Sequence, residues 1–400
     1  MWFRFVIALA AACLATAVSA ASTGDTERGA YLAVLGDCVI CHTAPGRPDR
    51  PFAGGYPLHA SFGTVYSSNI TPDEKTGMGN WTPDQFYRAL THGIGIDGKY
   101  LYPAFPYPYF TNVPRADSDS LFAYLRTVKP VRNTPTPNRL IFPTDIRAMM
   151  VFWDALFMPQ SVFHPDPSKP VEWNRGGELV HGLGHCGGCH TPKTFLFSDE
   201  KGKLLQGGLI DGWYAPNLTG SPRTGLGQWS VGDIETYLKT GENRFERVTG
   251  AMQDVVRVST SRMTDDDRKA IAVYLKSLPP APEKGLSAPP AQAMGIGQAG
   301  FFQNCSVCHA ADMKDYPPLG GNAIVQFADP TTMLRVILQG SQSIATPGKP
   351  VGYSMPAFAF LTDAEIADIA TFVRNSWGNH SGAVSPAQAT ELRHLLRTGS

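Results

Sequence analysis

The sequence predicts a mainly α-helical protein made of three tandem domains, each a small helical unit. Two cysteines and a histidine in the pattern C-x-x-C-H occur three times: "CVICH" at 38–42, "CGGCH" at 186–190 and "CSVCH" at 305–309. The surroundings of the first two copies also match, because Trp81 and Trp229 each follow their motif histidine by 39 residues. Each of the three stretches then ends in an amphipathic helical pattern: "DSLFAYLRTVKP", "DDDRKAIAVYLKSLPP" and "DAEIADIATFVRNSW".

The composition fits this organisation. A chain of 400 residues is longer than one small domain needs, and its 40 glycines and 33 prolines are typical of loops between short elements. Its 34 basic and 34 acidic residues balance, which argues against the basic surface of a nucleic-acid-binding protein. We therefore expect no nucleic-acid partner.

The domain boundaries follow from the repeats and from the proline-rich stretches between them. Short helical patterns with an Arg-Gly pair, "ERGAYLAVLGD" and "NRGGELVHGLGH", precede the first two motifs, and "LPPAPEKGLSAPPAQA" is typical of a semi-rigid linker. The predicted order is a signal peptide (1–20), domain 1 (21–130), a connecting segment (131–172), domain 2 (173–280), a linker (281–290), domain 3 (291–380) and a C-terminal tail (381–400).

The N-terminus resembles an export signal. Arg4 precedes an apolar stretch that runs from Phe5 to Val18, and Ala20 ends a small-residue cleavage site. An uncleaved anchor and a lipid anchor at Cys13 are the alternatives. We expect a mature chain in the periplasm, either free or held at the outer face of the inner membrane through a complex.

After cleavage at Ala20, every remaining cysteine belongs to a C-x-x-C-H motif. Cysteines three residues apart lie on one face of a helical turn, where both sulfurs can form thioether bonds to one haem, and the adjacent histidine can bind the iron. A zinc site would need two further ligands for each pair, and a redox dithiol needs no histidine. The pattern therefore favours covalent haem c, which is attached outside the cytoplasm.

Three covalent haems explain how so much glycine and proline can fold. A large apolar ring buried at the centre of each domain supplies core that the short helices alone do not. Leading helix, haem motif, wrapping loops and closing helix describe the plan of a c-type cytochrome domain. The sequence thus predicts three tandem c-type cytochrome domains, each wrapped around its haem.

Methionine opposite the histidine would complete the iron coordination and suit it to electron transfer. Met252 in "TGAMQDVV" and Met355 in "GYSMPAF" are the candidates in the second and third domains, with core packing as the alternative for each. In the third domain, Pro317 and Pro318 of "YPPLGGN" are placed where a backbone carbonyl could hold the imidazole of His309.

The first domain breaks this pattern. Phe105 stands where its repeat has Met252, and a phenyl ring cannot bind iron. Met78 pairs with Leu226 in the repeat alignment, which favours a core role. Met150, in the apolar segment "DIRAMMVFWDALF", is the preferred distal candidate, and an open or water-bound iron is a third possibility.

Several longer stretches carry a resemblance to a known family. "NITPDEKTGMGNW", "GKYLYPAFPYPYF", "EWNRGGELVHGLGHCGGCHTPK", "GWYAPNL", "YPPLGGN" and "FVRNSWGN" resemble the three-haem cytochrome c subunit of periplasmic membrane-bound dehydrogenases for alcohol, gluconate, sorbitol, fructose or aldehyde. The resemblance implies a partner dehydrogenase with a quinohaemoprotein, flavin or molybdenum centre, and ubiquinone or a terminal oxidase as electron acceptor. It carries over these haem ligands: Cys38, Cys41, Cys186, Cys189, Cys305 and Cys308 as attachment sites, and His42, His190 and His309 as proximal iron ligands.

Two functional classes remain at this stage. The first is an electron-transfer subunit without catalytic residues of its own. The second is a haem enzyme, such as a peroxidase or an oxidase, that uses an open first iron. The apolar segment around Trp153 either packs across the first two domains, as we expect, or faces a partner or a membrane surface.

Overall fold

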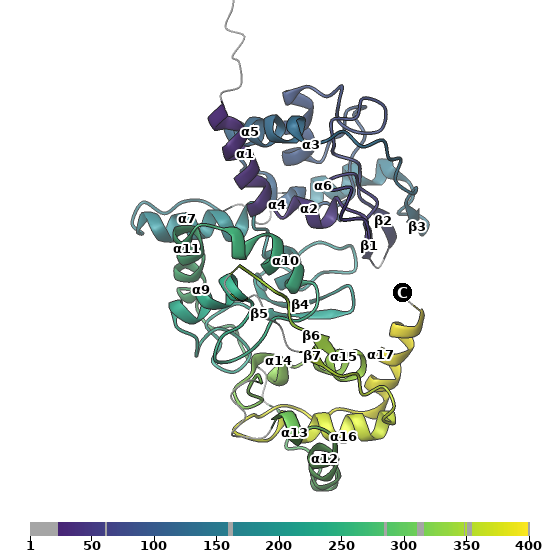
Figure 1. Ribbon diagram of the computed structural model, residues 1–400, viewed down its shortest axis with the longest axis vertical. Coiled ribbons are helices and arrows are strands. Elements are labelled where there is room, and N and C mark those ends of the chain that lie inside the picture. The colour runs from purple at the N-terminus through teal and green to yellow at the C-terminus, as the bar shows by residue number, and fades with distance from the viewer. Residues whose placement is uncertain are drawn as a thin grey trace, which may run out of the picture.

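A computed structural model describes residues 23–60, 62–158, 163–283, 286–309, 316–347, 349 and 354–398. The expected signal peptide, with Cys13, lies outside this range. The fold is mainly α-helical, as predicted, with three short β-sheets (Figure 1). Within the described ranges, none of the helices combines the length and the apolar character that crossing a membrane requires.

The first unit contains five helices and a β-hairpin. The helices are α1 (Thr23–Leu35), α2 (Cys38–Cys41), α3 (Pro83–His92), α4 (Tyr107–Phe110) and α5 (Arg115–Thr127). The hairpin strands β1 (Pro57–Ala60) and β2 (Gly63–Tyr66) pair in antiparallel register, and β3 (Arg139–Leu140) adds to β2. The connecting segment therefore begins as part of the first unit.

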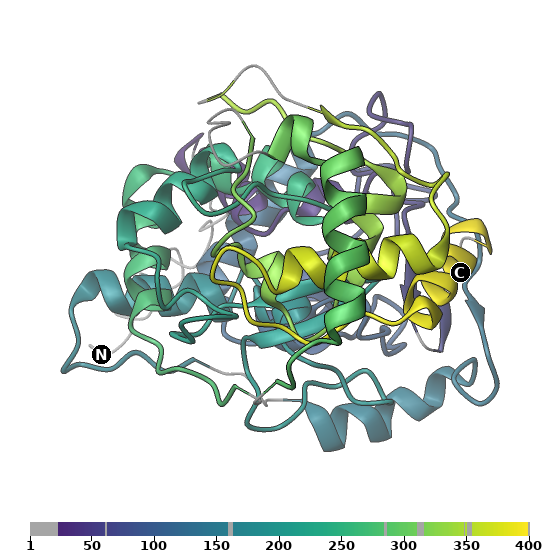
Figure 2. The same ribbon diagram turned by 90° about the horizontal axis from the view of Figure 1, so that it is seen from below.

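The connecting segment continues with the 3-10 turn η1 (Arg147–Met149) and with α6 (Met150–Phe157). Trp153 is buried, and its indole N–H donates a hydrogen bond to the Leu196 carbonyl of the second unit at 2.8 Å. This segment packs across the first two units, as we expected. The opposite face of α6 lies at the edge of the molecule (Figure 2), where Phe152 and Leu156 are 63% and 67% exposed.

The second unit repeats the plan of the first. Its elements are α7 (Val171–His181), α8 (Gly187–His190), β4 (Gln206–Ile210), β5 (Trp213–Asn217), α9 (Val231–Thr240), α10 (Met252–Val258), η2 (Thr260–Arg262) and α11 (Asp265–Lys276). Strands β4 and β5 form an antiparallel hairpin that corresponds to β1 and β2. Both hairpins stand in the same place along the chain, between the C-x-x-C-H helix and the next long helix.

The third unit is built differently between its first and last helices. It contains α12 (Ala291–Asn304), α13 (Ser306–His309), α14 (Ala323–Gln326), α15 (Thr331–Gln339), β6 (Ser341–Gln342), β7 (Ser354–Met355) and α16 (Asp363–Arg374). The stretch that we predicted as a tail holds another helix, α17 (Pro386–Thr398), which packs on α15 and α16. Arg393 of α17 binds Asp363 at 2.8 Å, and buried Leu392 joins the core of the third unit.

In all three units the leading helix crosses the closing helix at a glycine, and Figure 2 shows this crossing for α12 and α16. A Cβ atom added at Gly29, Gly176 or Gly297 would lie 1.9–2.0 Å from a backbone carbonyl oxygen of the opposite helix. The three pairs are α1 with α5, α7 with α11, and α12 with α16. Only glycine allows the backbones to approach so closely, so the same packing contact recurs three times along the chain.

The turns after the first two hairpins also match in detail. The backbone N–H of Met78 donates to the Thr71 carbonyl at 2.8 Å, and that of Leu226 donates to the Thr219 carbonyl at 2.8 Å. Helices α3 and α9 then begin with a capping box directly after Trp81 and Trp229. The sequence repeat of the first two stretches is therefore a structural repeat.

Candidate haem sites

The first motif forms the short helix α2, and His42 follows as its C-terminal cap. The Nδ1–H of His42 donates a hydrogen bond to the backbone carbonyl of Ser68 at 2.8 Å. Burial lowers the pKa of His42, and the carbonyl opposes this shift. The bond fixes the ring orientation and leaves Nε2 as the nitrogen that can bind a metal.

The second motif repeats this geometry. The Nδ1–H of His190 donates to the backbone carbonyl of Pro216 at 2.7 Å, and both acceptors lie 26 residues after their histidine. The sequence analysis missed Ser68 and Pro216. Their signal was present in the repeat, since each directly precedes the asparagine of "NITP" or "NLTG".

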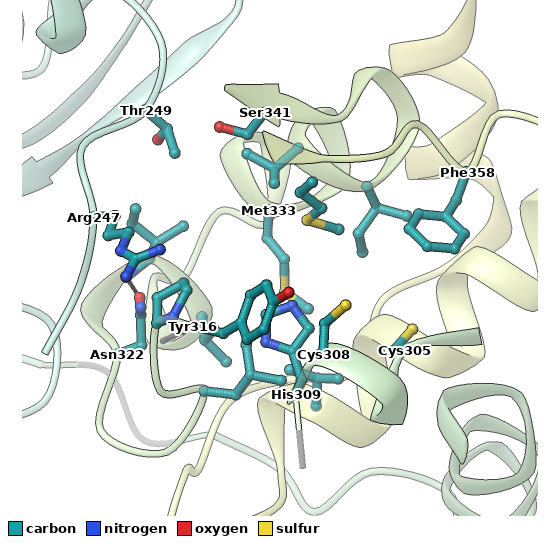
Figure 3. A pocket seen from close by; sticks show the side chains of 18 of the residues that line it. Arg247, Thr249, Cys305, Cys308, His309, Tyr316, Asn322, Met333, Ser341 and Phe358 are labelled. Carbon is teal, nitrogen blue, oxygen red and sulfur yellow. Dashed lines mark hydrogen bonds between the residues drawn. The ribbon is translucent and has the colours of Figure 1, made fainter. Parts of the chain in front are cut away.

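The third motif opens into a cavity of about 280 Å³ (Figure 3). Cys305, Cys308 and His309 line it together with Met355, so the predicted ligands of the third haem share one cavity. The other lining side chains are mainly apolar, as a haem ring requires. Burial lowers the pKa of His309, and the backbone carbonyl of Pro317 faces the ring and opposes this shift without completing a hydrogen bond. Within the described residues, the buried Nδ1 of His309 has no hydrogen-bond partner.

A second methionine that the sequence analysis did not consider also lines this cavity. Met333 is a buried residue of α15, and Figure 3 shows it extending into the cavity. Its position within a regular helix resembles ordinary core packing, whereas Met355 ends the short strand β7. Met355 therefore stays the candidate for distal ligand. Met333, which lines the same cavity, offers a control position for testing it.

The cysteine environments suit covalent attachment better than a thiolate metal site. Burial raises the pKa of Cys38 and of Cys186 to about 12, so neither sulfur is stabilised as an anion. The described residues also bring no three His, Cys, Asp or Glu side chains together in a way that could hold a metal ion. The two sulfurs of each motif, one histidine and an apolar surround fit haem c.

Met252 is the first residue of α10 and is partly buried against the core that the first two units share. Cys186 of the second motif packs against the same core. Helix α10 also touches α2, which places this part of the second unit beside the first C-x-x-C-H motif. The role of Met252 as distal ligand stays a prediction.

The first unit brings Phe105 and Met150 together. Phe105 packs against a cluster of buried side chains that contains Met150 and Tyr107, so the connecting segment does fold back onto the Phe105 loop. Met78 instead lies in the main core, as does its repeat partner Leu226. Met78 therefore has the core role that the repeat predicted for it.

The first and second motifs lie close to each other. Tyr109, at the end of the Phe105 loop, packs against the second motif, where a Cβ on Gly187 would lie 3.0 Å from its ring. Asp37, just before Cys38, lies 3.8 Å from Nε2 of His185, just before Cys186. His185 also packs edge-on against the ring of Phe110 in the first unit.

Comparison with known proteins agrees with this architecture. The cytochrome c family model matches residues 296–377. The chain is 39% identical to the cytochrome c subunit of the quinone-dependent alcohol dehydrogenase of Gluconobacter oxydans, over 98% of this chain and 88% of the relative. It is also 39% identical to the corresponding subunit of Gluconacetobacter polyoxogenes, over 93% and 85% of the two chains. The gluconate 2-dehydrogenase cytochrome c subunit of Pantoea cypripedii is 37% identical, over 93% and 89%. The chain therefore belongs to the family of cytochrome c subunits of dehydrogenases.

Proposed function

We propose that this protein is a three-haem cytochrome c that accepts electrons from a partner dehydrogenase and relays them to the respiratory chain. The observation that carries the proposal is the repetition of one ligand arrangement at the three motifs. Two cysteines and a histidine recur each time, and the first two histidines are held by a carbonyl 26 residues later. A single accidental motif would not come with the same supporting contacts.

Each haem would be held by the residues of its own motif. The attachment pairs are Cys38 with Cys41, Cys186 with Cys189, and Cys305 with Cys308, and the proximal ligands are His42, His190 and His309. Bound haem supplies one-electron chemistry at iron. The carbonyls of Ser68 and Pro216 would orient the first two imidazoles and increase their basicity.

The distal ligands would differ among the three sites. We propose Met252 for the second haem and Met355 for the third. For the first haem we propose Met150, which packs with Phe105 in one cluster. A thioether at each iron would raise its reduction potential and close the site to small molecules, as a relay requires.

Contacts between the units support transfer of electrons along the chain. The first two motifs are joined through Tyr109 and Gly187. The third cavity is closed in part by Arg247, Val248 and Thr249 of the second unit. The second unit thus borders both the first motif and the third cavity.

The partner would be the large subunit of a dehydrogenase with a quinohaemoprotein, flavin or molybdenum centre, and the acceptor would be ubiquinone or a terminal oxidase. The names of the relatives support a dehydrogenase partner. We place the protein in the periplasm, at the outer face of the inner membrane, held there through its complex. The comparisons do not support the alternative function, a haem enzyme of the peroxidase or oxidase kind.

Reduction by the partner tests this function. The oxidised protein, mixed with its dehydrogenase and the substrate of that enzyme, should become reduced within the turnover time of the complex. The same protein with substrate alone should stay oxidised, because in this proposal the partner supplies the substrate chemistry. Steady consumption of peroxide or of an organic substrate by the isolated chain would contradict the relay.

A further inference from the structure

A buried carboxyl group lies between the second and third units and has no part in the proposed haem ligation. Glu246 is 3% exposed, although glutamate is almost never fully buried without a partner. Its Oε2 atom has no hydrogen-bond partner within the described residues. A carboxylate in such a place costs free energy in its charged form.

The neighbours of Glu246 connect it to the cavity of the third motif. The next three residues, from Arg247 to Thr249, line that cavity together with His309, and Figure 3 shows Arg247 and Thr249 on its second-unit side. Ile324, whose backbone N–H faces the carboxyl group of Glu246, lines the same cavity. The carboxyl group is therefore placed directly behind one wall of the proposed third haem site.

The titratable and charged groups around Glu246 are few. From α9 the Tyr237 hydroxyl faces the carboxyl group, and the facing residue of α14, Ile324, carries no charge. On its own loop, Arg247 is paired with Glu242 at 2.8 Å, and Lys349 also pairs with Glu242. Burial raises the pKa of Glu246 to about 7, while Tyr237 and Ile324 oppose the rise.

An open surface cleft lies beside the helix that carries Tyr237. Thr236, Thr240 and Asn243 line this cleft, and Tyr237 lies between the two threonines on α9. Tyr237 is itself partly exposed. The Tyr237 hydroxyl group, which faces Glu246, therefore belongs to the helix that borders this cleft.

We propose that Glu246 binds a proton when the third haem gains an electron and releases it when the electron leaves. The added electron makes the site more negative by one charge, which favours the neutral carboxyl group at short range in a medium of low dielectric constant. The iron is reduced from the ferric to the ferrous state by an electron from the dehydrogenase, and water supplies the proton. Oxidation of the iron would pass the electron to the acceptor and release the proton to water.

This inference rests on the proposed function and is tested by the pH dependence of the haem potentials. Redox titrations of the holoprotein between pH 5 and 9 should show one haem whose potential falls as the pH rises through the neutral range. The slope should approach about 59 mV for each tenfold change in proton concentration. Glu246→Gln should abolish this slope. Glu235→Gln, which removes a partly exposed carboxylate of α9, should leave it unchanged.

A second measurement keeps the test decisive if the glutamine variant folds poorly. Tyr237→Phe retains the carboxyl group but removes a hydroxyl that lowers its pKa, so the sloping region should move to higher pH. Redox difference infrared spectra of the wild type should also show a protonated carboxyl band that appears on reduction.

Two outcomes would overturn the role of Glu246. One is a set of potentials independent of pH in the wild type, and the other is a slope that persists in Glu246→Gln. Either result with three haems attached would refute this inference alone. Absence of haem from the third motif would instead refute the proposed function.

Discussion

The Tyr109 hydroxyl group of the first unit donates hydrogen bonds to both carboxylate oxygens of Asp199 in the second unit, at 2.7 and 2.9 Å. Lys193 donates to the same hydroxyl at 3.1 Å and also pairs with Asp199. Tyr109 is buried, and its ring packs on the second motif. One tyrosine therefore connects the Phe105 loop to the second C-x-x-C-H motif.

Replacing this tyrosine should loosen the junction between the first two units. Tyr109→Phe removes hydrogen bonds to a charged group, so the free energy of unfolding should fall by about 2 kcal/mol. Chemical denaturation of the holoprotein measures the loss. Tyr100→Phe is a matched control, because the Tyr100 hydroxyl makes no hydrogen bond within the described residues. Equal losses in both variants would contradict the assigned junction.

The spin state of the first haem shows whether Met150 binds its iron. If it does, the reduced protein should be low-spin at all three haems, and Met150→Leu should turn one haem high-spin and lower its potential. Met78→Leu should leave the spin states unchanged, because Met78 lies in the main core. Optical spectra and redox titration measure both effects. An unmodified protein with one high-spin haem that binds carbon monoxide would show an open first iron instead.

The third haem allows a direct comparison of two methionines that line one cavity. Met355→Leu should remove the distal thioether, lower the potential of one haem and open it to carbon monoxide. Met333→Leu replaces one buried apolar side chain by another of similar volume and should cost less than about 1.5 kcal/mol without a change of spin state. If Met333→Leu changed the spin state and Met355→Leu did not, Met333 would be the distal ligand instead.

The pH dependence of stability should contain a contribution from His181. Burial lowers the pKa of His181 to about 4, and its Nε2 lies 2.7 Å from the Tyr274 hydroxyl oxygen. The unfolded chain binds the proton more readily, so stability should fall as the pH drops from about 6.5 towards 4. His181→Gln should reduce the loss of unfolding free energy between pH 7 and pH 5 by about 2 kcal/mol, as measured by denaturation. An unchanged loss would show that His181 is protonated in the folded state.

Much of this architecture could be predicted from the sequence because the repeats are short and local. The C-x-x-C-H spacing fixes two sulfurs and an imidazole on one turn, and "NITP" with "NLTG" fixes the turn after each hairpin. The closing helices show their amphipathic pattern directly. The crossing glycines are visible as Arg-Gly pairs only in the first two units, since Gly297 of the third follows isoleucine.

Other parts could not be predicted because they depend on contacts between distant residues. The Tyr109–Asp199 bond joins residues of two units, and nothing in either local pattern indicates it. Helix α17 lies in a stretch that carries no haem motif, so the sequence analysis treated it as a tail. Glu246 looks like an ordinary surface residue until the third unit covers it.

The haem content of the mature chain tests the central claim most directly. Intact mass spectrometry of the exported protein should give the peptide mass plus three haem groups, because we propose that each C-x-x-C-H motif attaches one. Cys186→Ala should weaken attachment at the second motif and leave the first and third haems in place, since each unit has its own leading and closing helices. A wild-type mass with only two haems would contradict the three-haem relay.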